Sequence, residues 1–240
     1  MSAATTNTAT RDGIDSVAIS LPDHWFTLPI RKQDFDRTVD ALRRSWHEDG
    51  LSRVDQRRCE LLLQRIRRQL GEGGIQLAGA SIEQGVRPGV EDTPANAEAL
   101  VAVCTFSALS RAELQTDVRL SIPVLYSAFA KRAPGDDGLA AITDIEPPEV
   151  CALPAGRAVR LRRLYRLTDP RGRLERWYAE TYVLPVGTDG DTAGVLQFST
   201  TNVGLAGEFS GLFAAFAETL TFFGADDHTV MNTAAEDEDV

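Results

Sequence analysis

The chain has few of the residues that build metal and redox sites. Its three histidines, His24, His47 and His228, are isolated, and no HxxxH or HExxH motif occurs. Three cysteines are present without a CxxC pair, which supports neither a zinc ribbon nor a disulfide framework. We expect reduced, buried thiols in a cytoplasmic protein, with no metal and no other cofactor.

Catalytic motifs are missing as well. The phosphate-binding patterns GxGxxG and GxxxxGKS/T do not occur, and neither does the serine-nucleophile pattern GxSxG. Cys151, at the entrance of a predicted strand, has no predicted histidine partner. Glu175 and Glu180 cannot share a substrate, because their odd spacing puts them on opposite faces of a strand. We therefore expect a protein that is not an enzyme.

Charge and hydropathy argue against further classes of protein. The net charge is −10, of which residues 225–240 carry −6, leaving −4 for residues 1–224. This acidic balance disfavours nucleic acid as a partner, because such binding needs a basic surface. No stretch approaches the roughly 20 apolar residues of a membrane helix, and the polar N-terminus does not resemble a secretory signal. We expect one domain over residues 16–224, between disordered tails at 1–15 and 225–240.

Two amphipathic helices are predicted early in the chain, over residues 34–48 and from Ser52 to about Leu70. Ser52 with Asp55 resembles a capping box that opens the second helix. The pair predicts an N-terminal helical hairpin with arginines on its outer faces. These arginines form either a solvated face paired with nearby acidic groups or a docking surface for an acidic partner, a phosphate or the chain's own acidic tail. The candidates for partner binding on this hairpin are Arg57, Arg58 and Arg65.

The rest of the chain predicts an antiparallel sheet. Strands are expected at 17–21, 75–85, 97–109, 158–167, 174–184 and 194–201, the fourth and fifth joined as a hairpin by a turn at 169–172. The break in alternation at Arg163 and Leu164 suggests a bulge. His24, Trp25 and Phe26 follow the first strand, as a plug at one end of the core or as a ligand platform.

Helices are expected on both sheet faces. One runs from about Ser121 with Pro123 in its first turn and Leu125, Tyr126 and Phe129 on its core face. Apolar residues at three- and four-residue steps over 205–220 predict another. The predicted fold class is therefore α+β, an antiparallel sheet flanked by helices on both faces as an α/β/α sandwich.

The strongest charged feature is an arginine face on the predicted hairpin. It comprises Arg160, Arg162 and Arg166 on one strand, with Arg173 and Arg176 across from them. It is either a surface ladder of salt bridges, with Glu175 and Glu180 as partners, or a site for an anion or a protein partner.

Five stretches of the sequence carry a family resemblance. They are LPAGRAVRLRR (153–163), WYAETYVLPVG (177–187), GVLQFSTTNVGL (194–205) and FSGLFAAFAETLTF (209–222), with PDHWF (22–26) after the first strand. They resemble a group of actinobacterial cytoplasmic proteins, and their order of elements resembles the PsbP-like fold. That fold occurs in an extrinsic photosystem II subunit and in a nuclear import factor that binds the GTPase Ran. The resemblance implies a fold and a protein-binding role, and it transfers no functional residues.

Three functional hypotheses follow. The first is a non-enzymatic interaction domain, an accessory or adaptor subunit of a larger bacterial assembly, whose partner is another protein or a second copy of the chain. The second is a small-molecule-binding protein or cryptic enzyme that uses a pocket between sheet and helices, with Trp25, Trp177, Tyr178 and Tyr182 as walls. The third, nucleic-acid binding through the arginine faces, is the least favoured because of the acidic balance.

Overall fold

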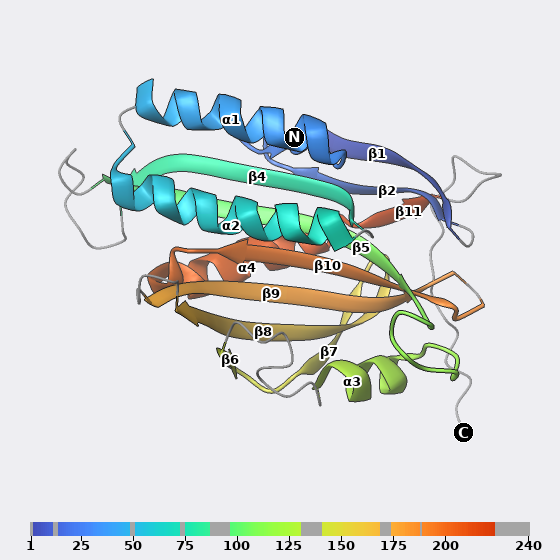
Figure 1. Cartoon of the computed structure of the whole chain (residues 1–240). Coiled ribbons are helices and arrows are strands. Elements are labelled where there is room, and N and C mark those ends of the chain that lie inside the picture. Colours follow the sequence, from blue (N-terminus) through green and yellow to red (C-terminus); the bar gives the residue numbers. More distant parts are fainter. Residues whose placement is uncertain are drawn as a thin grey trace.

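The computed structural model describes residues 2–11, 14–48, 51–72, 75–86, 97–130, 141–168, 174–187 and 189–223. Within these ranges the chain forms two antiparallel sheets and the helices α1 to α4 (Figure 1). The predicted α+β class with an antiparallel sheet is therefore confirmed. Strands dominate the structure more than the sequence suggested, because a second sheet was not predicted.

The larger sheet has eight strands. Its order is β3-β4-β5-β10-β9-β8-β6, with β7 also paired to β8, and all of its pairs are antiparallel. The strands are β3 (Phe26–Thr27), β4 (Ile75–Val86), β5 (Ala97–Ser110), β6 (Ala141–Asp144), β7 (Glu149–Leu153), β8 (Gly156–Thr168), β9 (Leu174–Val186) and β10 (Thr192–Thr200). The predicted hairpin is formed by β8 and β9.

A smaller sheet has the order β1-β2-β11. Its strands are β1 (Ser2–Arg11), β2 (Ile14–Leu21) and β11 (Thr221–Phe223). β1 pairs with β2 across a range for which the sequence predicted a disordered tail, residues 1–15. The predicted acidic tail, residues 225–240, lies outside the described part of the chain.

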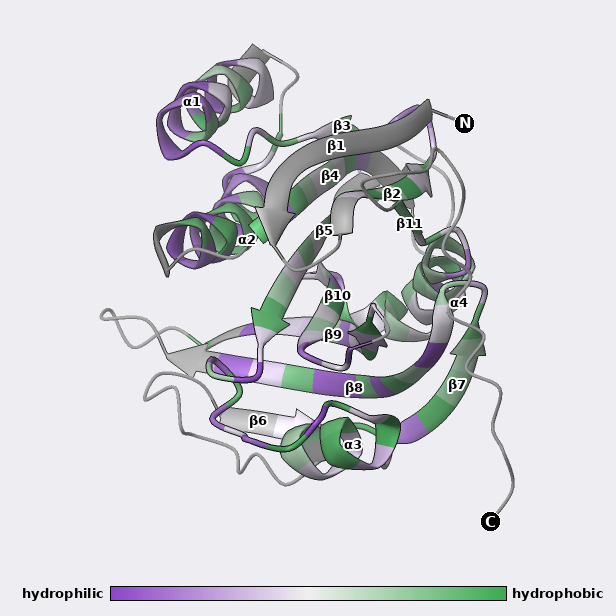
Figure 2. Cartoon of the chain, turned by 90° about the vertical axis from the view of Figure 1, so that its right-hand side faces the viewer, coloured by the Kyte–Doolittle hydropathy of each residue, from purple (hydrophilic) through white to green (hydrophobic). Residues whose placement is uncertain are grey.

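Three helices cover one face of the larger sheet (Figure 2). They are α1 (Lys32–Glu48), α2 (Arg53–Glu72) and α3 (Ile122–Ala130). Leu62 of α2 shares a buried cluster with Trp177 and Ala179 of β9, and Leu125 of α3 shares another with Val183. The odd-numbered residues of β9 thus face these helices, as the two-residue period of a strand requires. No helix in the described ranges combines the length and apolar character needed to span a bilayer.

The starts of two helices follow the predicted chemistry. The Ser52 hydroxyl accepts a hydrogen bond from the Asp55 backbone N–H at 3.1 Å and donates one to its carboxylate at 2.7 Å, so the predicted capping pair forms. Pro123 lies in the first turn of α3, where its missing N–H is not needed. α1 and α2 follow each other in the predicted order, and three strands precede them where the sequence predicted one.

The opposite face carries η1 (Val203–Leu205) and α4 (Ala206–Ala217), and the larger sheet curves around α4 (Figure 2). Phe213 of α4 stacks on Phe198 of β10, with ring centroids 4.9 Å apart, and also lies against Tyr178. The smaller sheet closes the same core through Ile19 and Phe222. This face is therefore covered by a helix and a second sheet together.

Two local predictions were wrong. The β8–β9 register runs without a shift from Val159 to Thr168, so no bulge exists at Arg163. The alternation breaks there because Arg163 occupies a buried position, where its guanidinium bonds Asp144 at 2.6 Å and the Phe129 carbonyl at 2.8 Å. Tyr126 was placed on the core face of α3, but it is 37% exposed.

Asn202 extends the sheet beyond the last residue of β10. Its Oδ1 accepts a hydrogen bond from the Val101 N–H, and its Nδ2 donates to the Ala99 carbonyl, both at 2.9 Å. The side chain thus satisfies backbone groups of β5 that a strand would otherwise bond. Because Asn202 directly precedes η1, these bonds set the point at which the chain leaves the sheet toward α4.

Candidate functional site

A pocket lies between α4 and the larger sheet, and its floor comes from β4 and β5. Ser81 and Glu83 project from the same face of β4, two residues apart. The register places Ser81 opposite Ala102 and Glu83 opposite Leu100 of β5. Ser81 and Ala102 are small, so this part of the sheet leaves space under α4.

The walls come from two other segments. The turn between β2 and β3 contributes His24 and Trp25. The start of α4 and the residue before it contribute Leu205, Glu208, Phe209 and Leu212. The pocket has a volume of about 260 Å³ and is partly open to solvent. Most of the lining is therefore apolar, with polar groups contributed by a few positions.

Gly79 sets the position of Trp25. A Cβ atom at Gly79 would lie 3.0 Å from the Leu21 Cδ1 atom and 3.8 Å from a ring carbon of Trp25. The missing side chain thus lets the β2–β3 turn approach β4 closely. Trp25 also meets Phe216 of α4 edge to face, with centroids 5.5 Å apart, so the two walls are packed together.

Four polar side chains line the pocket. His24 Nδ1 lies 3.3 Å from Glu83 Oε1, and both side chains are a little under half exposed. Glu208 is exposed in the first turn of α4. Ser81 is only 6% exposed, and its hydroxyl has no hydrogen-bond partner among the described residues. Ser81 Oγ is not among the fully buried unsatisfied atoms of the described residues, and Ser81 lines the pocket, so its hydroxyl is available to a bound molecule.

Ser81, His24 and Glu83 are residue types found in acyl-transfer enzymes, but their arrangement does not favour that chemistry. Within the described ranges no hydrogen bond joins the Ser81 hydroxyl to His24, as a nucleophile and its base would require. The backbone of Ser81 lies inside the β4–β5 ladder and not at a turn that could supply oxyanion donors.

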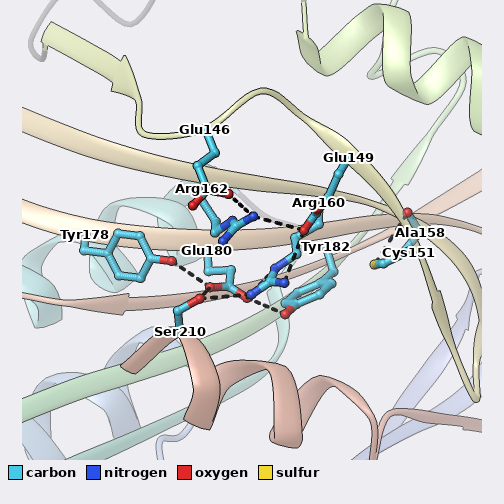
Figure 3. Close-up of polar contacts among 10 residues, drawn as sticks. All are labelled: Glu146, Glu149, Cys151, Ala158, Arg160, Arg162, Tyr178, Glu180, Tyr182 and Ser210. Atoms are coloured by element: carbon cyan, nitrogen blue, oxygen red, sulfur yellow. Dashed lines mark hydrogen bonds and ion pairs between the residues drawn. The ribbon is translucent and has the colours of Figure 1, made fainter. Parts of the chain in front are cut away.

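A buried charged cluster fixes α4 beside this pocket (Figure 3). Glu180 of β9 is fully buried. Its Oε1 accepts hydrogen bonds from Arg160 Nε at 2.8 Å and from the Tyr182 hydroxyl. Its Oε2 accepts from the Tyr178 hydroxyl at 2.7 Å and from Ser210 Oγ of α4 at 2.8 Å. The carboxylate therefore joins the sheet to the helix.

Arg160 completes the cluster. It donates to Glu149 and to Ser210, at 3.2 and 3.0 Å, and its guanidinium lies 5.7 Å from the Tyr182 ring centroid. Burial acts to lower the pKa of Arg160, but the negative charge of Glu180 and weaker effects of its neighbours outweigh it and raise the pKa. Arg160 thus keeps its positive charge in the folded state. The members of the cluster satisfy one another's hydrogen bonds, so the cluster connects the sheet to α4.

The other predicted arginines of the hairpin are placed differently. Arg162 forms ion pairs with Glu146 and Glu149. Like Arg160, it is thus paired within the molecule, which agrees with the interpretation of this face as a ladder of salt bridges. Arg166 and Arg176 are exposed and lie opposite each other in the β8–β9 register. Arg173 lies outside the described residues.

The helical arginines lie on the other face of the sheet. Arg65 points toward the sheet, not outward as predicted: it bonds Gln197 at 2.7 Å and stacks over Tyr165 and Trp177. Arg58 pairs with Asp55 at 3.1 Å. Arg57 is half-buried and also has an interaction partner. The two predicted arginine surfaces are therefore not brought together.

Of the predicted pocket walls, only Trp25 lines the cavity. Trp177 stacks on Tyr165 at 5.0 Å under α2, on the opposite face. Tyr178 and Tyr182 belong to the Glu180 cluster. The spacing of two tyrosines around a glutamate, each two residues away on the same strand face, is the signal that could have identified the cluster.

The cysteines are poor candidates for nucleophiles. Burial raises the pKa of Cys59 to about 12 and also raises the pKa values of Cys104 and Cys151. All three are free. They are therefore protonated at neutral pH and lack thiolate character.

Comparisons with known proteins show only distant likeness. No protein-family model matches the chain, and no curated protein matches it. A similar solved structure is that of LpqN, involved in cell envelope biogenesis of Mycobacterium tuberculosis, with 12% identity, a TM-score of 0.42, and coverage of 92% of this chain and 91% of that one. CalU16 from Micromonospora echinospora has 13% identity and a TM-score of 0.21, covering 56% of this chain and 85% of its own.

Removing the central carboxylate tests the Glu180 cluster. We expect Glu180→Ala to lower the free energy of unfolding by about 3 kcal/mol, because the partly buried Arg160 loses its main partner. Glu149→Ala, which removes a partly exposed carboxylate from the same arginine, should cost less than about 1 kcal/mol. Urea unfolding followed by circular dichroism measures both values, and equal costs would contradict this account.

The cluster also predicts sensitivity to alkali. Burial raises the pKa values of Tyr178 and Tyr182, and the adjacent Glu180 adds to both shifts. The unfolded chain ionises its tyrosines near pH 10 while these two stay protonated in the folded state, so stability is full below about pH 10 and falls as pH rises further. Each tyrosine contributes up to about 1.4 kcal/mol per pH unit.

The measurement is the free energy of unfolding in urea between about pH 8 and 11. Tyr178→Phe or Tyr182→Phe should make its alkaline decline shallower. The same change at Tyr126, on the partly exposed side of α3, is the control and should leave the slope unchanged. An unchanged slope in both cluster variants would disprove the linkage.

Proposed function

We propose that the protein is a non-enzymatic binding protein that takes an apolar ligand into the pocket between α4 and strands β4 and β5. The observation that carries this proposal is an apolar pocket of about 260 Å³ with the side chain of Ser81 in its floor, whose hydroxyl has no hydrogen-bond partner among the described residues. Small-molecule sites are typically apolar with a few placed polar groups, and their volumes begin near 300 Å³. The size favours a compact or chain-like ligand.

The packing around the pocket supports this proposal. Phe213 and Phe198 fill the space between α4 and the sheet nearby, as expected for a close-packed interior. At the pocket, by contrast, Leu212 is 39% exposed although it belongs to the apolar side of the helix. An apolar surface left open beside a packed core is a common mark of a binding site.

A charge at the mouth of the pocket provides the test. We expect Leu212→Arg to weaken binding of the neutral dye Nile red by about tenfold or more, because the ligand would have to displace or desolvate a guanidinium. The matched control is Val54→Arg, which introduces the same charge at a 63% exposed position on α2. Fluorescence titration gives both affinities. Equal binding by the two variants would contradict the proposed site.

A role as an interaction domain or adaptor is a second candidate, favoured by one edge of the larger sheet. β7 pairs with β8 and has no other strand partner within the described ranges. Val150 lies on this edge strand and is 43% exposed, and Ile145, which precedes the strand, is 48% exposed. An edge strand with exposed apolar side chains can take an extra strand from another protein or from a second copy.

Solution assembly tests this second role. We expect Val150→Lys to shift a concentration-dependent dimer toward monomer, or to abolish co-purification of a stoichiometric partner protein, because a lysine blocks edge pairing. Leu174→Lys makes the same change at a 60% exposed position and should have no effect. Light scattering after size exclusion and a pull-down from the host are the measurements. A monomer without any partner would argue against the edge.

We also propose a cytoplasmic location and a relationship to the PsbP-like fold. Free, buried Cys59 and Cys104 support the first, since unpaired thiols suit a reducing compartment. The second is supported by the stretches that carry the resemblance, which form β8, β9, β10 and α4.

A further inference from the structure

We infer that the ligand of this pocket carries a positively charged group of the ammonium type at the end of an apolar chain. This inference rests on the proposed function and adds the charge of the ligand. It is carried by two carboxylates and the hydroxyl of Ser81, which line the same apolar pocket.

The two carboxylates that line the pocket come from different elements. Glu83 projects from the sheet and Glu208 from α4, so a carboxylate stands on each side of the cavity. No lysine or arginine occurs among the described lining residues. His24, the remaining titratable group, lies beside Glu83, whereas Glu208 has no ion-pair partner within the described part of the chain.

Structural needs explain only part of this arrangement. A carboxylate in the first turn of α4 interacts favourably with the helix dipole, which accounts for the sign of Glu208. The second carboxylate of the same apolar pocket, Glu83, lies beside His24 but is 43% exposed, so it stays accessible to a bound molecule. Walls of low dielectric strengthen the field of both charges inside the pocket. A cation between them gains from both, and an anion is repelled by both.

Ser81 supplies the third contact. It lies two residues before Glu83 on the same strand face, roughly 7 Å along the chain, within reach of one bound head group. An ammonium has three hydrogen-bond donors and no acceptor, whereas a carboxylate has acceptors only. The hydroxyl oxygen of Ser81 and the two carboxylates can accept all three donors. The apolar chain then lies against Trp25 and Phe209.

Three probes with one chain length separate charge from apolar burial. We expect octylammonium to bind the full chain about five- to twentyfold more tightly than 1-octanol, which follows from two partly exposed ion pairs of up to about 1 kcal/mol each. Octyl sulfate should bind most weakly. The measurement is calorimetric titration at low ionic strength, and added salt should reduce the preference for the ammonium.

The double variant Glu83→Gln/Glu208→Gln assigns the preference to the two carboxylates. We expect it to bring octylammonium within about twofold of 1-octanol while the affinity for 1-octanol stays unchanged. The control is Asp36→Asn/Asp40→Asn, which removes two carboxylates from α1 and should keep the full preference. A preference that survived in the glutamate variant would overturn the inference.

The outcomes separate this inference from the proposed function. If the three probes bind with equal affinity and Leu212→Arg weakens them all, the pocket binds apolar ligands and the inference of a cation is wrong. If none of the probes binds, both proposals are wrong. A preference for octylammonium that is lost only in the glutamate variant supports both.

Discussion

The buried carboxylate of Glu180 is the constraint on which the arrangement of this protein depends. A charge this deep is tolerated only when it is paired and fully hydrogen-bonded. The partners come from three elements: Arg160 of β8, Tyr178 and Tyr182 of β9, and Ser210 of α4. Satisfying one carboxylate therefore fixes the helix against the sheet. The position of α4 in turn decides where the sheet is covered and where it is left open.

The two faces of the larger sheet are covered by different elements. On one face α1, α2 and α3 bury the odd-numbered side chains of β9, and Arg65 stacks over Tyr165 and Trp177. On the other face α4 packs on Phe198 and the smaller sheet closes the core. Between α4 and the larger sheet, the small residues Ser81 and Ala102 leave a cavity. The pocket thus lies on the face that α4 and the smaller sheet cover.

Local patterns predicted most of the elements correctly. Runs of strand-forming residues between turn signals located β8, β9 and β10, and the three- and four-residue steps located α1, α2 and α4. Ser52 and Pro123 marked helix starts because their effects act within one turn. The smaller sheet was missed because β1 is a polar run without a hydrophobic pattern. Arg163 was taken for a bulge because a buried ion pair looks like a break in alternation.

The sequence by itself determined the fold class, the faces of the strands and the absence of common catalytic motifs, because these depend on residue type and short spacing. It also predicted that Glu180 could pair with the arginines. Only the tertiary structure decided that this pair is buried beneath α4, that Arg65 and Arg160 lie on opposite faces, and that Ser81, Glu83 and Glu208 line one pocket. The reason is physical. A cavity and its charges arise from packing between segments that are distant in the chain, and local periodicity carries no information about which segments meet.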